Sequence, residues 1–175
     1  EIPMSCCTDC TGCFVWYDLD SAKAQDSLAF YTELIGWGTM MWGDGDFQYP
    51  MFTVGQTPVG GFRQLPEQAV LAGCPNAWLA YVGVDDVDAT VARAVELGAK
   101  VHVAPRDLPD VGRMAVFFDP QGAAIAVFKG QAAPPPKPSM DSPGMVGWHE
   151  LATSDYEAAW QFYSQVFGWK IAQDM

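Results

Sequence analysis

The chain has 175 residues, half of them hydrophobic, which suffices for one complete core and part of a second. Its formal net charge of −12 would repel phosphate backbones and anionic lipids, so neither nucleic acid nor a membrane is an expected partner. No stretch approaches the roughly 18 apolar residues of a membrane helix, and the first basic residue is Lys23, so we predict a cytoplasmic location.

Residues 1–11 form a cysteine-rich tail, whereas Cys74 stands alone further along the chain. The tail and the residue pair after it hold two overlapping Cys-x-x-Cys steps, enough thiolates for a zinc ion or a cluster. Structural zinc sites usually join two separated ligand pairs, so we favour a reduced tail over a metal site. The candidate ligands would be Cys6, Cys7, Cys10 and Cys13.

Residues 12–64 carry the signals of a strand, a helix and three further strands. Aromatic and β-branched residues predict a strand at 13–19, after which Asp20 or Ser21 can cap a helix that ends at Gly36. Turn signals separate the strands predicted at 39–42, 48–54 and 59–64.

The same order returns in residues 77–130, so the chain is predicted to contain two successive βαβββ units. A strand at 77–84 precedes a cap at Asp85 or Asp86 and a helix that ends at Gly98. A shift of 62 places Trp16 on Trp78, which supports an internal duplication. The remaining strands are predicted at 100–104, 113–118 and 123–129.

A stronger repeat joins the start of the chain to its end. At a shift of 132, seven residues recur without a gap: Gly12, Trp16, Leu19, Phe30, Tyr31, Gly36 and Trp37 fall on Gly144, Trp148, Leu151, Phe162, Tyr163, Gly168 and Trp169. The proline-rich residues 131–143 are predicted to be an extended linker between modules.

Residues 144–175 are therefore expected to begin a second module with a strand and a helix, the helix opened by a capping box from Ser154 to Glu157. One strand and one helix cannot bury their own apolar face. The segment must dock on the first module, pair with another molecule, or belong to a longer protein, and we favour the last. A homodimer or a pseudo-dimer of modules is the expected assembly.

Three groups of motifs resemble the vicinal oxygen chelate superfamily of glyoxalases, bleomycin-resistance proteins and extradiol dioxygenases. They are FVWYDL at 14–19 with FY at 30–31 and GW at 36–37, VDDVDA at 84–89 with ELGA at 96–99, and FDPQGA at 118–123. The resemblance implies an α+β fold in which paired βαβββ units form a cup-shaped mixed sheet with helices outside. It also implies a divalent metal held by histidine or glutamate on the first strand and glutamate on the last strand of each unit.

The residues at these ligand positions depart from the family pattern. Counting back from FY at 30–31, the first-strand position falls on Trp16, and in the second unit it falls on Trp78 or Leu79. The last-strand position is Ala126, with a counterpart among residues 61–64, and Trp148 takes the histidine position of the second module. None offers imidazole or carboxylate, so no metal centre and no cofactor are expected, a divalent ion being the alternative.

The tryptophans Trp16, Trp78 and Trp148 are the candidate ligand-binding residues, because they could wall an aromatic pocket. The competing interpretation is that they are core residues. On alternating strands Asp18 shares a face with Trp16, and Glu150 shares one with Trp148, which makes both carboxylates candidate acids or bases. The commoner role of such a carboxylate is a hydrogen bond to a neighbouring strand.

The leading functional hypothesis is a metal-free, glyoxalase-like protein that binds a small organic molecule in an aromatic cup. It would either sequester that molecule, as bleomycin-resistance relatives do, or modify it. Two-module proteins with this tryptophan pattern are often labelled hydroxylase-like or glyoxalase-like, a label that implies no demonstrated reaction. One alternative is a metal-dependent lyase, isomerase or dioxygenase with atypical ligands such as Asp18 and Glu150. Another is a non-catalytic assembly module.

Overall fold

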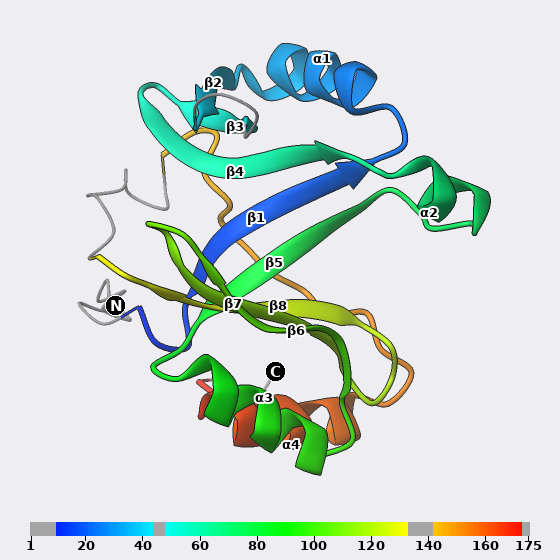
Figure 1. Cartoon of the computed structure of the whole chain (residues 1–175). Helices are drawn as coiled ribbons and strands as arrows, with labels where there is room; N and C mark the ends of the chain where they lie inside the picture. Colours follow the sequence, from blue (N-terminus) through cyan, green and yellow to red (C-terminus); the bar gives the residue numbers. More distant parts are fainter. Residues whose placement is uncertain (1–9, 44–47, 133–141, 173–175) are drawn as a thin grey trace. The chain divides into compact units, whose positions relative to one another are not determined.

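The computed structural model describes residues 10–43, 48–132 and 142–172 (Figure 1). Within them the fold is α+β, with a mixed eight-stranded sheet and four helices, which confirms the predicted fold class. None of these helices is long and apolar enough to cross a membrane. The strands are β1 (Phe14–Ser21), β2 (Gly38–Trp42), β3 (Tyr49–Val54), β4 (Thr57–Gln64), β5 (Ala77–Gly83), β6 (Lys100–Leu108), β7 (Gly112–Phe118) and β8 (Ala124–Gly130); the helices are α1 (Ala24–Ile35), α2 (Glu67–Leu71), α3 (Val87–Glu96) and α4 (Tyr156–Phe167).

The chain divides into two compact units that do not coincide with continuous stretches of sequence. Unit A contains residues 16–79 and 135–150, and unit B contains residues 1–15, 80–134 and 151–175. The C-terminal repeat is therefore shared, because its first residues belong to unit A and its helix belongs to unit B.

Unit A is a four-stranded sheet covered on one face by α1 (Figure 1). Its strand order is β2-β3-β4-β1, with β1 parallel to β4 and the other neighbours antiparallel. Because side chains alternate along a strand, Trp16, Asp18 and Asp20 lie on the face of β1 opposite α1. The core on the α1 face consists of Leu19, Ala24, Phe52, Val59 and Phe62.

Unit B repeats this plan with the order β5-β8-β7-β6, in which β5 is parallel to β8. The helices α3 and α4 lie side by side on its core (Figure 1). Asp86 caps α3 by accepting a hydrogen bond from the Ala89 amide at 2.9 Å. The sequence predicts a cap at either Asp85 or Asp86. The core of unit B includes Val82, Val87, Val91, Ala94, Phe117, Val127, Ala159, Phe162 and Tyr163.

Two predicted helix caps are wrong by one to three residues. The N-cap of α1 is Lys23, whose amide donates to Ser21 Oγ at 3.1 Å, so Ser21 supports the turn before the helix instead of capping it. The N-cap of α4 is Asp155 instead of Ser154, and it accepts from the Ala158 amide at 2.9 Å. The hydroxyls of both predicted serine caps are engaged elsewhere: Ser21 Oγ lies 2.8 Å from Ser27 Oγ, and Ser154 Oγ donates to Gln121 Oε1 at 3.1 Å.

The strand predicted at the start of the second module is not formed. Residues 146–153 are in neither helix nor strand, and in the described part of the chain no strand pairs with them. A strand is stabilised by backbone hydrogen bonds to a neighbouring strand. This segment has the sequence pattern of a strand but lacks those hydrogen bonds. The short helix α2, by contrast, was not predicted, because five residues are too few for a periodic signal.

Candidate functional site

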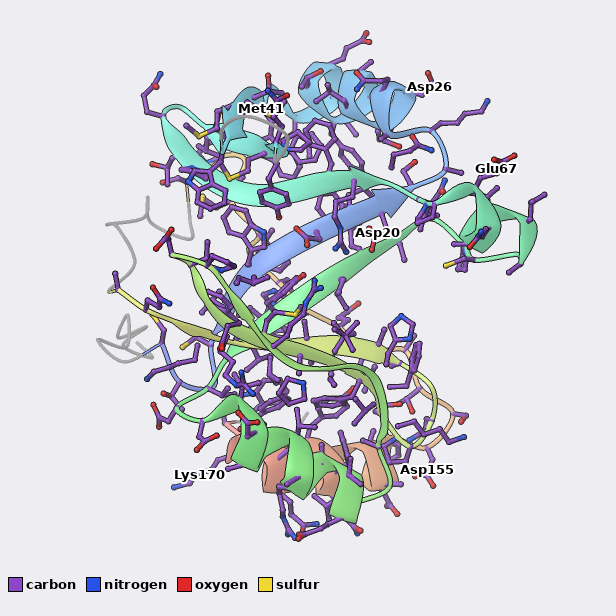
Figure 2. The ribbon with its side chains drawn as sticks, viewed as in Figure 1. Asp20, Asp26, Met41, Glu67, Asp155 and Lys170 are labelled. Carbon is purple, nitrogen blue, oxygen red and sulfur yellow. The ribbon has the colours of Figure 1, made fainter. Side chains whose placement is uncertain are left out.

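A hydrogen-bonded network occupies the face of unit A opposite α1, which we call the network face. Asp18 is only 3% exposed and accepts hydrogen bonds from the Trp16 indole at 3.0 Å and from the Tyr49 hydroxyl. The indole also donates to the Tyr49 oxygen at 2.8 Å. Arg63 lies 3.7 Å from Asp18 and 2.9 Å from Asp20, which projects from β1 in Figure 2. The carboxylate therefore fixes two aromatic rings and is held by a cation.

Gly61 is the residue that makes room for this network. It lies level with Asp18 in the β1–β4 register, on the network face. A Cβ at Gly61 would overlap the Tyr49 hydroxyl and come within 2.6 Å of Asp18 Oδ1. The position therefore requires glycine, since any side chain would displace the phenol from the carboxylate.

Two exposed apolar side chains extend the network face toward its edge strand. In the β2–β3 register Trp42 is level with Tyr49 and Met40 is level with Met51, so both lie on the network face. Trp42 is 41% exposed and Met40 is 40% exposed. A flat aromatic surface and an adaptable thioether thus lie beside the ordered Trp16–Tyr49 pair, whose ring centroids are 6.4 Å apart.

The strand registers narrow the choice of residues at the metal-ligand positions that the family resemblance implies. On β5 Tyr81 is level with Ala126 and Val82 belongs to the α3-side core, so Leu79 and not Trp78 lies on the face opposite the helices. In unit A the corresponding first-strand and last-strand residues are Trp16 and Gly61.

These side chains do not fit a hard or borderline divalent ion. An indole, a leucine, an alanine and a glycine provide no oxygen, nitrogen or sulfur ligand of the kind such ions bind. The place of a ligand side chain at Gly61 is already filled by Tyr49 and Asp18. Among the described residues, no three His, Cys, Asp or Glu side chains are grouped so that they could hold a metal ion.

We expect protein purified without chelator to carry well under one equivalent of zinc, nickel, iron or manganese. The physical reason is the missing donor set at the four ligand positions. Elemental analysis by mass spectrometry measures the ratio directly. The comparison is a chain without residues 1–10, which removes most tail thiolates. One equivalent of metal retained by that shortened chain would contradict the expectation.

Trp78 lies on the α1 side of unit A and not with Trp16 on the network face. Its ring packs against Tyr31, Trp37 and Phe52, with ring centroids 5.3 to 6.1 Å apart, and its indole donates to the Tyr31 hydroxyl at 2.9 Å. Trp78 is still 38% exposed. The structure thus separates two tryptophans that the sequence treated as companions in one pocket.

The second repeat contributes a contact on the same α1 side. The Tyr17 hydroxyl lies 2.6 Å from His149 Nε2, and the two rings stack with centroids 5.6 Å apart. Burial raises the pKa of Tyr17 to about 12 and lowers that of His149, so both groups are held neutral. Neighbouring Trp148 is 76% exposed and Glu150 is also exposed, so their predicted ligand-binding and catalytic roles stay predictions.

Half of the candidate thiol site lies beyond the described residues. Cys6 and Cys7 fall outside them, whereas Cys10 and Cys13 are described and half-buried. The Cys13 amide donates to the Cys10 carbonyl at 3.2 Å, so the second Cys-x-x-Cys step forms a tight backbone turn.

A family model described as a glyoxalase-like domain matches residues 16–128. The protein named "Putative glyoxylase CFP32" of Mycobacterium tuberculosis is 40% identical over 121 residues, which cover 68% of this chain and 44% of that protein. The anthracycline biosynthesis protein DnrV of Streptomyces peucetius is 34% identical over 174 residues, which cover 90% of this chain and 61% of DnrV. The chain thus spans about half the length of these relatives.

Solved structures support the same fold at lower identity. The Mn(II)-bound glyoxalase of Novosphingobium aromaticivorans matches with a TM-score of 0.55 and 22% identity, covering 90% of this chain and 52% of that one. A methylmalonyl-CoA epimerase of Streptomyces coelicolor matches with a TM-score of 0.51 and 14% identity, covering 70% and 97%. Sequence motifs, paired βαβββ units and the matching domain agree: the chain belongs to the glyoxalase-like family of the vicinal oxygen chelate superfamily.

Proposed function

We propose that the chain binds a small, planar aromatic molecule on the network face, without a metal ion. The observation that carries the proposal is the Trp16–Tyr49–Asp18 network, with Trp42 exposed beside it. The N–H of Trp16 and the O–H of Tyr49 both donate hydrogen bonds inside the network. A ligand would therefore contact the faces of the two rings, which the network holds at a fixed angle. A planar molecule can stack on these rings with little loss of side-chain conformational entropy, because the rings are already ordered.

The chemistry of this face distinguishes binding from acid–base catalysis. Both oxygens of Asp18 already face donors or a cation, namely Trp16 and Tyr49 on one oxygen and Arg63 on the other. A carboxylate in this position orders its neighbours and has little freedom to exchange a proton with a ligand. We therefore assign Asp18 as a positioning residue, and the ligand class as aromatic and largely apolar.

The name of one relative supports this ligand class. DnrV, which matches 90% of the chain, carries a name from the biosynthesis of anthracyclines. Flat, fused aromatic rings with hydroxyl and ketone groups would suit a surface made of Trp16, Tyr49, Trp42 and Met40. Sequestration of such a molecule needs no residue beyond those that the network face holds.

The test is a titration with 1,4-dihydroxyanthraquinone as the planar probe, followed by quenching of tryptophan emission. Trp42→Ala should weaken binding about tenfold, which corresponds to about 1.4 kcal/mol of lost stacking. Trp78→Ala is the matched comparison, since Trp78 is similarly exposed but lies on the α1 side. It should leave the dissociation constant within about twofold of the parent, a difference of about 0.4 kcal/mol. The reverse pattern, with Trp78→Ala the damaging change, would place the ligand on the α1 side and refute the proposed site.

A further inference from the structure

The two repeats make the same contact with exchanged roles. The Trp37 indole donates to the Gly144 carbonyl at 2.8 Å, and the Trp169 indole donates to the Gly12 carbonyl at 2.7 Å. At the shift of 132, Trp37 corresponds to Trp169 and Gly12 to Gly144. Each tryptophan therefore donates to the glycine carbonyl of the other repeat. Because the two repeats make equivalent contacts here, the partners of one repeat indicate which partners the other repeat would have.

In unit B the second repeat's helix is buried. Phe162 is 4% exposed and packs with Tyr163 against α3. The Tyr163 hydroxyl donates to Asp119 Oδ2 at 2.8 Å, and burial and this carboxylate raise its pKa. The Gln121 amide donates to the Asp155 carbonyl at 2.8 Å. A helix and an Asp-Pro-Gln-Gly turn at 119–122 thus cover one face of α4.

The same face is exposed on α1. Phe30, the counterpart of Phe162, is 57% exposed, and Leu34, the counterpart of Val166, is 66% exposed. Both helices have twelve residues and end at a left-handed glycine, so their faces correspond position by position. An apolar face that is buried in one copy of a repeat and open in the other points to a missing occupant.

A cavity of about 360 Å³ lies beside this face, where the turn would be expected. It is bordered by Ser21 and Lys23, the counterparts of Thr153 and Asp155, which hold Gln121 in unit B. Tyr31, the counterpart of Tyr163, also borders it; its oxygen accepts from Trp78, so its hydroxyl hydrogen remains available for donation.

We propose that the exposed face of α1 and this cavity are the docking site for the second half of another glyoxalase-like module. A helix of the α3 kind, with small aliphatic residues on one face, would cover Phe30 and Leu34. An Asp-Pro-x-Gly turn would enter the cavity, and its aspartate would accept the Tyr31 hydroxyl. This interface is separate from the network face and does not depend on ligand binding.

A second copy of the chain is a poorer occupant than an additional half-module. Its α3 and its 119–122 turn are already covered by its own α4, so it could offer them only after α4 had been displaced. The curated relatives, in contrast, are longer than the matched region, which covers 44% and 61% of their lengths. They have enough additional chain for such a half-module.

The test is a tandem chain in which residues 1–143 are followed by a copy of residues 12–130, compared with the 175-residue chain. Amide hydrogen exchange of α1 should slow at least tenfold in the tandem chain. Phe30→Asp in the first copy should return exchange to the rate of the 175-residue chain. Ala29→Asp is the matched control, because its counterpart Gln161 stays exposed on α4, and it should leave exchange slow.

Equal exchange in the two chains, or equal effects of the two substitutions, would overturn the proposal. Light scattering on the 175-residue chain provides an independent measurement that does not rely on folding of the tandem. We expect a monomer at high concentration. Self-association that Phe30→Asp abolishes would identify a second copy as the occupant and refute the half-module.

Discussion

Phe162→Asp is expected to lower the free energy of unfolding of the 175-residue chain by about 4 kcal/mol, because it removes a buried ring and places a charge in its site. Phe162 is 4% exposed and lies in the core of unit B with Val87 and Val91. Losing it should also release Tyr163 from Asp119, since both contacts depend on the docked helix. Urea unfolding followed by far-ultraviolet circular dichroism measures the change.

The matched controls for this prediction are Gln161→Asp on the exposed side of α4 and Phe30→Asp at the equivalent place in α1. Both should remain within about 0.5 kcal/mol of the parent, as expected for exposed positions. If Phe30→Asp were as damaging as Phe162→Asp, α1 would already be covered in this chain, which contradicts the difference in exposure between the two phenylalanines.

Asp18→Ala is expected to lower the free energy of unfolding by about 3 kcal/mol. It should also weaken the near-ultraviolet circular dichroism of the aromatic residues. The change removes the carboxylate that accepts from the Tyr49 hydroxyl and from Trp16 and that faces Arg63. Trp16 keeps the Tyr49 oxygen and Arg63 keeps Asp20 as partners, so the loss falls mainly on the Tyr49 hydroxyl, and loss of an acceptor for a buried donor costs about 1–3 kcal/mol. Binding of the planar probe should weaken as well, because the two rings lose the group that sets their angle.

Two substitutions distinguish the contribution of the hydrogen-bonded network to stability from that of negative charge on this face. Asp18→Asn keeps an acceptor oxygen and should retain most of the stability, whereas Asp20→Asn alters a more exposed ion pair with Arg63 that is worth at most about 1 kcal/mol. A loss in Asp20→Asn equal to that in Asp18→Ala would show that charge on this face, and not the hydrogen-bonded network, provides the stability.

The fold was predictable because its signals are local. Strand alternation, helical spacing and terminal glycines place almost every element. Helix α1 is capped by Gly36 as predicted, whereas α3 ends at Glu96, two residues before the predicted Gly98. The strand at 146–153 failed for the opposite reason. Its pattern is correct, but a strand is stabilised by neighbours that sequence spacing cannot supply.

The candidate site was only partly predictable. Trp16 and Asp18 share a face by alternation, as expected. Tyr49 and Trp42 were missed, since their place beside Trp16 depends on the register of strands far apart in sequence. The turn signal between them could have indicated that they face each other across a hairpin. Trp78 was placed with Trp16 by a shift that is one residue off, and on a strand one residue changes the face.

The contact between Tyr17 and His149 joins two residues that occupy the same position of the repeat, 132 residues apart. In a symmetric dimer built from one gene product, a position that meets itself across the two-fold axis must present the same side chain twice. At this position such a dimer would contain either two tyrosines or two histidines facing each other. Once both copies are encoded in one chain, each can mutate separately, and a phenol can face an imidazole. Because both repeats lie in one chain, this position is free of the identity that two-fold symmetry would impose, and it pairs a phenol with an imidazole.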